Sequence, residues 1–578
     1  MHFIRIYSGL LLGMITLAAC SKLKVDQRSG NNPTETQMTA STVRLVNLAG
    51  FTDLIVNGQK LTIFVPPFPD GTPRNPAPTP YFPTTGTLGT TYFIPEQFLD
   101  AGDSATVQEE AAYNSGNSVY TFSGPTFGVK ETYNNPTDYY EIFSRTAGAT
   151  SGSTYYDSLV VVPRAVSPAA DPTHILVRLV NLSSAPDDAG LTGPMSLSYA
   201  DGEHVSASTD NIAPHSWSNY VELPYGSYQF KVLTAQNAQV AGVPVNTLTP
   251  LLVADQFTTV LSGMGLTYAP IQTFQPGGVY TIVVSVNNGY QYSYGGTGGS
   301  LNDQYNTYRI ITDVNPPVNL TYSRLQATNA VPDTSLTVLV DGSPLGSSLA
   351  YDSSSAYQSF VTGTHQISVQ DGTGKELVTK TVNLLGNTNF TIWIFPSGSG
   401  VDFLMAQNNL GGERNETYNA DGSDPSSSTT YNSFPFMVRF LNFCPDLPYV
   451  TFTQANGALF VDGVASTALA AQNLPFGGQL SSTLVPFPYA STNGPVSLGG
   501  LGEIQVYQSQ PSEVPGNWLR DIPSLPVSAF ISMPASFYPA GLPGFGEPGV
   551  YTVALTGRYG AGVPAGQEAK LIIIKHTK

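Results

Sequence analysis

Val177-Arg178-Leu179-Val180-Asn181-Leu182 is a short apolar run that is interrupted by one arginine and one asparagine. A near copy lies upstream at residues 43–48, and a looser copy lies downstream at residues 438–443. A degraded version, Ser323-Arg324-Leu325-Gln326, lies between them. Short runs rich in Val, Ile and Leu are typical of buried strands. Four occurrences of one strand motif therefore predict a domain that is repeated four times.

The third occurrence opens the most regular part of the chain. The alternation of apolar and polar residues predicts seven short strands, at residues 322–327, 336–340, 356–361, 365–370, 376–384, 390–395 and 402–406. Asp341-Gly342 and Gly363-Thr364 supply turns between them. Seven strands at this spacing, without a helical period, predict an antiparallel β-sandwich of immunoglobulin or transthyretin type.

The same order of strands is expected in the other copies. Their clearest strands are predicted at 54–58, 139–143 and 158–162, then at 195–200, 226–232, 278–284 and 308–313, and finally at 459–463, 503–507, 550–555 and 571–574. The Pro-rich residues 66–83 cannot be central sheet, because proline removes a ladder donor. Residues 511–548 are a second Pro/Gly-rich insertion, and the Gly-rich residues 287–306 are expected to be a hairpin tip.

These patterns divide the chain into segments. We expect a signal peptide at 1–19 and a lipidated cysteine with a flexible tether at 20–41. We expect β-sandwich copies at 42–166, 172–318, 319–410 and 434–578, with a polar linker at 411–433.

Composition excludes one class of partner. Charged residues are 11% of the 578, and the net charge is −17, so the phosphates of nucleic acid would be repelled. The hydrophobic fraction of 41% is too high for a generally disordered chain. The abundance of Gly (56), Pro (45) and Tyr (32) suits many strands joined by turns.

The N-terminal residues predict export and attachment to a lipid. An apolar run ends in Leu17-Ala18-Ala19-Cys20, which resembles the bacterial lipobox. There the cysteine sulfur takes a diacylglycerol, whose acyl chains include palmitate, and the cysteine becomes the first residue of the mature protein. The alternative is ordinary signal cleavage beside an incidental cysteine. We predict a lipoprotein held in the outer membrane through Cys20, because several acyl chains give a durable anchor. No later run reaches the roughly 20 apolar residues of a membrane helix.

The side of the outer membrane that the protein faces stays open. Surface-exposed lipoproteins of Bacteroidota resemble one another in carrying acidic residues directly after the lipidated cysteine, whereas this chain has Ser21-Lys22-Leu23-Lys24. That resemblance favours the periplasmic side. The acidic, Tyr-rich body with its long loops favours the surface.

The repeated motif, followed by Pro-Asp, by a strand that ends in Asp-Gly and by a closing Gly-x-Tyr-Thr-Val hairpin, resembles the bacterial "domain of unknown function 4397" family. Its members are often secreted or lipid-anchored and are common in Bacteroidota. The family has no established catalytic residues, so the resemblance assigns none here. The third copy departs from the motif, with Ala327 where the others have asparagine.

The sequence predicts no catalytic, cofactor-binding or metal-binding residue. The histidines are scattered without the spacing of a zinc pair, and residues 417–422 resemble a calcium loop that lacks its first acidic ligand. We predict that Cys444 is buried and packs as a small hydrophobic residue rather than acting as a nucleophile. A motif arginine recurs in every copy, which favours a structural ion pair or a strand-end contact, at Arg44, Arg178, Arg324 and Arg439.

Three tryptophans are candidates for stacking on sugar rings. Trp393 lies in an apolar run and is expected in a core, whereas Trp217 and Trp518 lie in more polar or Pro/Gly-rich segments and are the better candidates. The sequence therefore predicts a non-enzymatic envelope lipoprotein with a binding or structural role, whose partner is the membrane and also a glycan or an envelope protein. One alternative is a polysaccharide-binding surface protein. The other is a hydrolase with a site split between distant loops, which is disfavoured because no reactive groups converge in the sequence.

Overall fold

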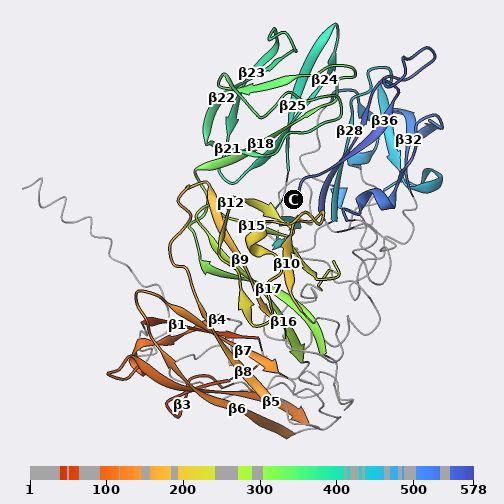
Figure 1. Cartoon of the computed structure of the whole chain (residues 1–578). Coiled ribbons are helices and arrows are strands. Elements are labelled where there is room, and N and C mark those ends of the chain that lie inside the picture. Colours follow the sequence, from red (N-terminus) through yellow and green to blue (C-terminus); the bar gives the residue numbers. More distant parts are fainter. Residues whose placement is uncertain are drawn as a thin grey trace, which may run out of the picture.

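The computed structural model describes residues 39–48, 51, 53–63, 65, 91–115, 118–144, 156–183, 193–237, 239–240, 271–288, 304–408, 410, 413–416, 428–431, 436–460, 469–478, 485–486, 503–533, 547 and 549–578. Within these residues every regular element is a strand or a short 3-10 turn, which confirms the predicted all-β class (Figure 1). Cys20, the Pro-rich residues 66–83, the Gly-rich residues 289–303 and the calcium-like loop at 417–422 lie outside the described residues.

Four two-layered β-sandwiches follow one another along the chain, and we call them domains 1 to 4. Domain 1 has one sheet of β4 (Thr91–Pro95), β1 (Ala40–Asn47), β7 (Thr137–Ser144) and β8 (Tyr156–Pro163). Its second sheet is β3 (Gln59–Lys60), β2 (Asp53–Val56), β5 (Ser104–Ser115) and β6 (Ser118–Lys130). The hydrophobic core of domain 1 lies between these two sheets, as a sandwich requires.

Domain 2 is built around β9 (His174–Leu182), which contains the quoted motif. It pairs with β11 (Ser216–Trp217), β12 (Val221–Pro224) and β16 (Val279–Asn288), and β16 pairs with β17 (Gln304–Val314). The opposite layer consists of two short sheets, β10 (Met195–Ser198) with β14 (Lys231–Thr234) and β13 (Gly226–Tyr228) with β15 (Gln272–Phe274). The single strand that was predicted at 226–232 is thus wrong, because the chain changes partner sheet between Tyr228 and Lys231.

Domain 3 matches its seven predicted strands closely. One sheet is β21 (Gln358–Val361), β18 (Tyr322–Asn329), β24 (Asn389–Ser397) and β25 (Gly400–Gln407). The other is β20 (Ser343–Pro344), β19 (Thr337–Val340), β22 (Gly363–Gln370) and β23 (Glu376–Leu384). Only the two-residue β20 was not foreseen.

Domain 4 has a sheet of β31 (Val485–Pro486), β28 (Phe436–Asn442), β35 (Gly549–Thr556) and β36 (Lys570–Lys575). The other sheet is β30 (Leu474–Pro475), β29 (Tyr449–Thr453), β32 (Glu503–Gln510) and β33 (Glu513–Trp518), with β34 (Leu525–Pro526) beside β32. No strand is present at the described part of 459–463, where Leu459 forms only an isolated bridge with Thr453. The insertion at 511–548 supplies β33 and β34 to the sheet, and a two-stranded sheet, β26 (Glu413–Glu416) with β27 (Ser428–Tyr431), lies inside the predicted linker.

All four domains share one departure from a purely antiparallel sandwich. The motif strand runs parallel to the closing strand, in the pairs β1–β7, β9–β16, β18–β24 and β28–β35. The other strand pairs among the described residues are antiparallel. A parallel pair needs a long crossover, and here the second sheet of each domain supplies it.

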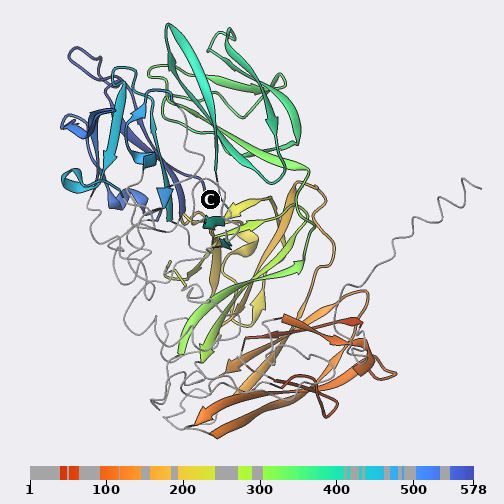
Figure 2. The same cartoon turned by 180° about the vertical axis from the view of Figure 1, so that it is seen from behind.

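The motif strand has apolar residues at both odd and even positions because both of its faces are buried. Successive residues of a strand point to opposite faces. In β9, Val177 and Leu179 enter the core of domain 2, whereas Val180 and Leu182 enter a second cluster that contains residues of domain 1. Figures 1 and 2 show these two domains packed together in both views.

The asparagine of the motif ends each strand by bonding the backbone of the next loop. The Asn181 amide donates to the Ile212 carbonyl (2.8 Å) and its oxygen accepts the Ser183 N–H (3.1 Å). In domain 3 the same role belongs to Asn329, which donates to the Leu349 carbonyl (3.0 Å) and accepts the Val331 N–H (2.9 Å).

The alignment of the third motif on Arg324 and Ala327 is therefore wrong by two residues. In the parallel pairing, Arg178 lies opposite Thr281 and Arg439 opposite Thr552, while Gln326 lies opposite Thr391. Gln326 occupies the place of the motif arginine. The strand-ending hydrogen bonds set the register, and they cannot be read from the charge pattern.

Domain 3 should fold as an isolated fragment of residues 319–410. Its own core is continuous between its two sheets, so the fragment should show a cooperative melt and a β-type circular dichroism spectrum. Trp393, buried by domain 4 in the whole chain, should become exposed and shift its emission to longer wavelength. A fragment that stays unfolded would show that the domain needs its neighbours and that these boundaries are wrong.

Candidate functional site: buried polar junctions between domains

Domains 1 and 2 meet through the outer faces of their motif sheets. The shared apolar cluster takes residues from both sides: Val46, Leu48, Tyr140, Ile142 and Val162 of domain 1, and Val180, Leu182, Val283 and Ile311 of domain 2. All are at most 3% exposed. The outward half of the motif thus serves as an interdomain face.

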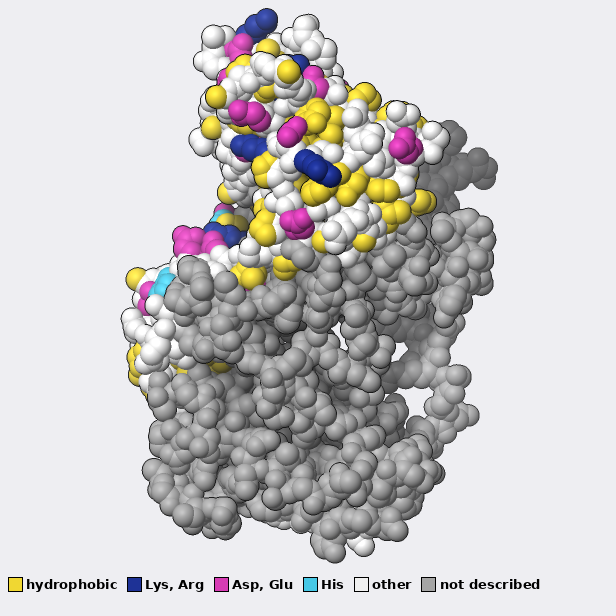
Figure 3. Space-filling model, turned by 90° about the vertical axis from the view of Figure 1, so that its right-hand side faces the viewer, with side chains coloured by type: hydrophobic (Ala, Val, Ile, Leu, Met, Phe, Trp, Pro, Cys, Tyr) yellow, Lys and Arg dark blue, Asp and Glu magenta, His cyan; other side chains and the backbone are white. Residues whose placement is uncertain are grey.

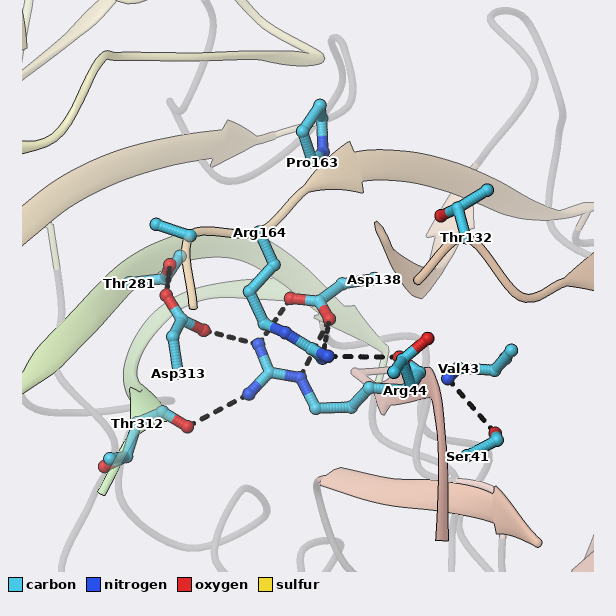
Figure 4. Close-up of polar contacts among 12 residues, drawn as sticks. Ser41, Val43, Arg44, Thr132, Asp138, Pro163, Arg164, Thr281, Thr312 and Asp313 are labelled. Atoms are coloured by element: carbon cyan, nitrogen blue, oxygen red, sulfur yellow. Dashed lines mark hydrogen bonds and ion pairs between the residues drawn. The ribbon is translucent and has the colours of Figure 1, made fainter. Parts of the chain in front are cut away.

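A charged network lies at the edge of this cluster (Figure 4). Arg44 Nε donates to Asp138 Oδ1 (2.9 Å), and its Nη2 bonds both Asp138 Oδ2 and Asp313 Oδ1. Arg164 Nη1 shares Asp138 Oδ1 (2.7 Å), and Arg44 Nη1 donates to the Thr312 carbonyl (3.0 Å). Asp313 and Thr312 belong to domain 2, so one arginine of domain 1 binds across the boundary.

Arg178 occupies the matching place in domain 2. Its Nε donates to Thr281 Oγ1 (2.8 Å), and its Nη1 donates to the Pro163 carbonyl of domain 1 (2.5 Å). The Thr281 hydroxyl in turn donates to Asp313 Oδ2 (2.5 Å). The Arg178 guanidinium also lies 4.6 Å from the centre of the Tyr220 ring. Three guanidinium groups and two carboxylates therefore share one buried junction.

Electrostatics keeps this junction charged. Burial opposes the charge on Arg44, but hydrogen bonding and attraction from Asp138 and then Asp313 outweigh it, so the pKa of Arg44 is raised above its ordinary value. Burial likewise raises the pKa of the Tyr140 phenol, which stays neutral. A charge-paired, hydrogen-bonded network of this kind is costly to break on one side only.

Domains 3 and 4 meet in the same way. Trp393, Phe395 and Ala406 of domain 3 pack against Leu441 and Phe443 of domain 4. The Trp393 ring stacks on Phe443 at 5.5 Å between centroids. Trp393 is 0% exposed, as expected for a core residue.

The polar edge of this second junction is nearly free of charge pairs. Arg439 donates to Asn408 Oδ1 (3.1 Å) and to the Gln407 carbonyl, and no carboxylate among the described residues forms an ion pair with it. Burial lowers the pKa of Arg439 to about 10. Burial, and then the charge of Arg439, lower the pKa of His576 to about 3, so His576 is neutral and bonds Thr552 Oγ1 through Nε2 (2.8 Å).

Arg324 belongs to the junction between domains 2 and 3. Its guanidinium lies 5.6 Å from the centre of the Tyr225 ring of domain 2 and 4.5 Å from that of Tyr357. A Cβ on Gly226 would lie too close to the Arg324 guanidinium, so a larger residue there would displace the end of the arginine side chain. Each repeated arginine thus lies at a domain boundary, although Arg324 lies two residues before the motif position. Of the four, Arg44 is the one that forms an ion pair within the described part of the chain.

The two tryptophans proposed for sugar stacking are partly exposed, Trp217 at 39% and Trp518 at 43%. They lie on different domains, in β11 and in β33. The Trp518 ring already contacts the Arg520 guanidinium (5.0 Å) and stacks with Tyr507 (6.4 Å). A sugar would have to share or replace these contacts.

The polar depression at one end of domain 1 has few groups left to act on a ligand. Asn57 bonds the Phe98 carbonyl and the Thr106 N–H, and Asp100 Oδ1 accepts the N–H groups of Gly102 and Ser104. The Tyr139 hydroxyl bonds the backbone of Lys130 twice. The polar groups named here are therefore engaged with the backbone and do not form a reactive site.

Other candidate groups stay apart. Burial raises the pKa of the Cys444 thiol to about 11, which suits its place in the core of domain 4. Within the described ranges, no group of three or more His, Cys, Asp or Glu side chains could hold a metal ion. Lys and Arg side chains are interspersed with Asp and Glu over the described part of the face in Figure 3, without a large patch of one sign.

No helix in the described part of the chain combines the length and apolarity needed to span a membrane.

Comparison with known proteins identifies one domain. Residues 323–419 match the family described as "Domain of unknown function (DUF4397)". No curated protein matches the chain. The match covers domain 3 and continues into the segment that holds β26.

Solved structures show only distant similarity. A "putative cell adhesion protein" from Bacteroides uniformis is 8% identical over 41% of this chain and 98% of its own, with a TM-score of 0.12. Another so described, from Bacteroides fragilis, is 14% identical over 65% and 99%, with a TM-score of 0.12. A leucine-rich repeat protein from Bacteroides thetaiotaomicron is 10% identical over 38% and 26%, with a TM-score of 0.10. At these TM-scores no function follows from the likeness.

Proposed function

We propose that this chain, whose residues 323–419 form a DUF4397 domain, is a non-catalytic protein of the bacterial cell envelope that acts as a rigid, lipid-anchored scaffold. Its domains hold binding loops at a fixed distance and orientation from the membrane. Its partners are the membrane, through an N-terminal lipid, and an envelope protein or glycan.

The observation that carries this proposal is the burial of the domain junctions. Domains 1 and 2 share the cluster around Val180 together with the Arg44 network, and domains 3 and 4 share the cluster around Trp393. Interfaces between mobile domains are usually small and polar. Apolar, fully buried junctions with polar networks instead fix the relative orientation of neighbours, which is the property a scaffold needs.

A catalytic role has less support. The charged groups buried at the junction of domains 1 and 2 are hydrogen-bonded to one another. The groups that line the depression of domain 1 are hydrogen-bonded to the backbone. A hydrolase would need a nucleophile or a pair of carboxylates open to substrate.

Replacing Cys20 by alanine should release the protein from membranes into the soluble fraction. The acyl chains on Cys20 are the membrane contact that we propose, and their loss removes the free energy of anchoring. Fractionation of cells that express wild type and Cys20→Ala measures this, with Cys444→Ala as the control because Cys444 is buried. A Cys20→Ala protein that still sediments with the outer membrane would contradict the anchor.

Polysaccharide binding is the second candidate function, and the partial exposure of Trp217 and Trp518 supports it. A glycan array and an envelope pull-down with the chain that begins at Cys20 separate the two candidates. Binding that is lost in the Trp217→Ala or Trp518→Ala variant would favour the glycan role.

Protease shaving of intact cells determines whether the scaffold faces the surface or the periplasm.

A further inference from the structure

A third kind of junction joins domain 2 to domain 4, although domain 3 lies between them in the sequence. The residues of domain 2 that make it are Gln229, Lys231 and Leu233, which alternate with the core residues Phe230 and Val232. They therefore lie on the outer face of the β10–β14 sheet. In Figures 1 and 2 the chain end marked C lies between these domains.

An ion pair lies at the centre of this junction. Lys231 Nζ is 2.9 Å from Glu547 Oε1, and both side chains are 0% exposed. The second oxygen of Glu547 accepts the Ser532 N–H (3.2 Å). The carboxylate is thus fixed by domain 4 and presented to a lysine of domain 2.

A second ammonium group enters the same junction from β36. Lys575 Nζ donates to Gln229 Oε1 (2.7 Å) and to Ser532 Oγ (3.0 Å), and it lies 3.8 Å from Glu547 Oε2. Its side chain is 15% exposed. Two amines therefore share one carboxylate in a nearly dry interface. Burial lowers the pKa of Lys231, against the attraction of Glu547, as it lowers that of Lys575, because protonation of both amines would leave an excess positive charge there.

The contact extends on both sides of these charges. Leu233 packs against Met533 and Ile531, and the Gln229 N–H donates to the Lys578 carbonyl (2.7 Å). The Lys578 ammonium lies 4.0 Å from the centre of the Tyr199 ring. Domains 2, 3 and 4 therefore close into a ring in which each touches the other two.

We propose that the junction of Lys231, Glu547 and Lys575 is a pH-sensitive latch, which holds domain 4 against domain 2 more tightly once Lys575 loses its proton. Neutral Lys575 can still donate to Gln229 and Ser532. The junction then contains one ammonium and one carboxylate, and the excess charge is gone.

The groups around Lys575 support the loss of its proton in the closed form. Burial lowers its pKa to about 8, Glu547 opposes that change, and Lys231 adds to it. Asp201 also acts on Lys575, more weakly. The Tyr551 ring lies 6.0 Å from Lys575, and Lys578 and Tyr199 lie at the border of the junction.

The sign of the pH effect follows from proton binding. In the closed form burial lowers the pKa of Lys575 to about 8, and detaching domain 4 exposes the amine to water, which returns its pKa toward the ordinary value of 10.5. Between these pKa values the open form binds more protons, so the closed form becomes more stable relative to the open form as the pH rises. Below pH 8 both forms are protonated and the pH has no further effect through this group. From pH 7 to pH 9 the closure equilibrium should rise about tenfold.

Hydrogen exchange on the full chain measures this equilibrium. The Gln229 amide bonds the Lys578 carbonyl across the junction, so its protection, corrected for intrinsic exchange, should rise about tenfold from pH 7 to pH 9. The Ile282 amide in the core of domain 2 is the internal reference. Equal protection of Gln229 at the two pH values overturns the proposal.

Variants assign the effect to the latch. Lys575→Met should show wild-type pH 9 protection already at pH 7 and no pH dependence. Lys570→Met, on the same strand but 46% exposed and paired with Asp352, should keep the wild-type rise. Glu547→Gln should lower protection at both pH values. A Lys575→Met protein that keeps the tenfold rise overturns the assignment, and the wild-type measurement decides the proposal even where a variant does not fold.

Discussion

Asp138→Asn should weaken the docking of domain 1 on domain 2 by about 3–5 kcal/mol. The Asp138 carboxylate is 0% exposed and accepts hydrogen bonds from both Arg44 and Arg164. Asparagine keeps the shape but removes the charge, so the Arg164 guanidinium would lose this carboxylate and Arg44 would keep its ion pair with Asp313. The expected result is loss of the junction before either domain loses its own core.

Denaturant unfolding of the full chain, followed by hydrogen exchange at the β1 and β17 amides, measures this loss. Asp402→Asn is the matched control, because Asp402 pairs with Lys380 at a surface where the two side chains are 37% and 42% exposed. That pair should be worth less than about 1 kcal/mol. An Asp138→Asn effect as small as the control would mean that the arginine network does not hold the domains together.

Trp393→Ala should destabilise the junction of domains 3 and 4 by about 3–5 kcal/mol. The indole is fully buried, stacks on Phe443 and lies beside Phe395 and Ala406, so truncation would leave a large cavity in the interface. The core of domain 3 lies on the other face of β24, at Ile392 and Ile394, and should be retained.

Thermal unfolding measured by circular dichroism should show an early transition for domain 4 separation in Trp393→Ala. Trp518→Ala is the control, since that side chain is 43% exposed. Equal transitions in the two variants would show that the burial of Trp393 contributes little to docking.

Local pattern was sufficient to predict much of the fold. Asp341-Gly342 and Gly363-Thr364 identified the strand order of domain 3, and the apolar runs identified the closing hairpins β7–β8 and β35–β36. Local pattern did not predict the strands that depend on pairing with distant segments. The long hairpin of β5 and β6 and the insertion strand β33 were not predicted, and neither has a strong local period.

The sequence alone determined that the motif strand is buried and that it carries a structural arginine, which takes the same place in domains 1, 2 and 4, because residue type is a local property. Only the tertiary structure decided what each face meets. Arg44 finds Asp313 269 positions away, and Gln326, not Arg324, takes the motif place in domain 3 because Asn329 sets the register. Alternation tells which side of a sheet a residue occupies, but not which domain covers that side. That depends on the shape and charge of complete surfaces, which exist only after each domain has folded.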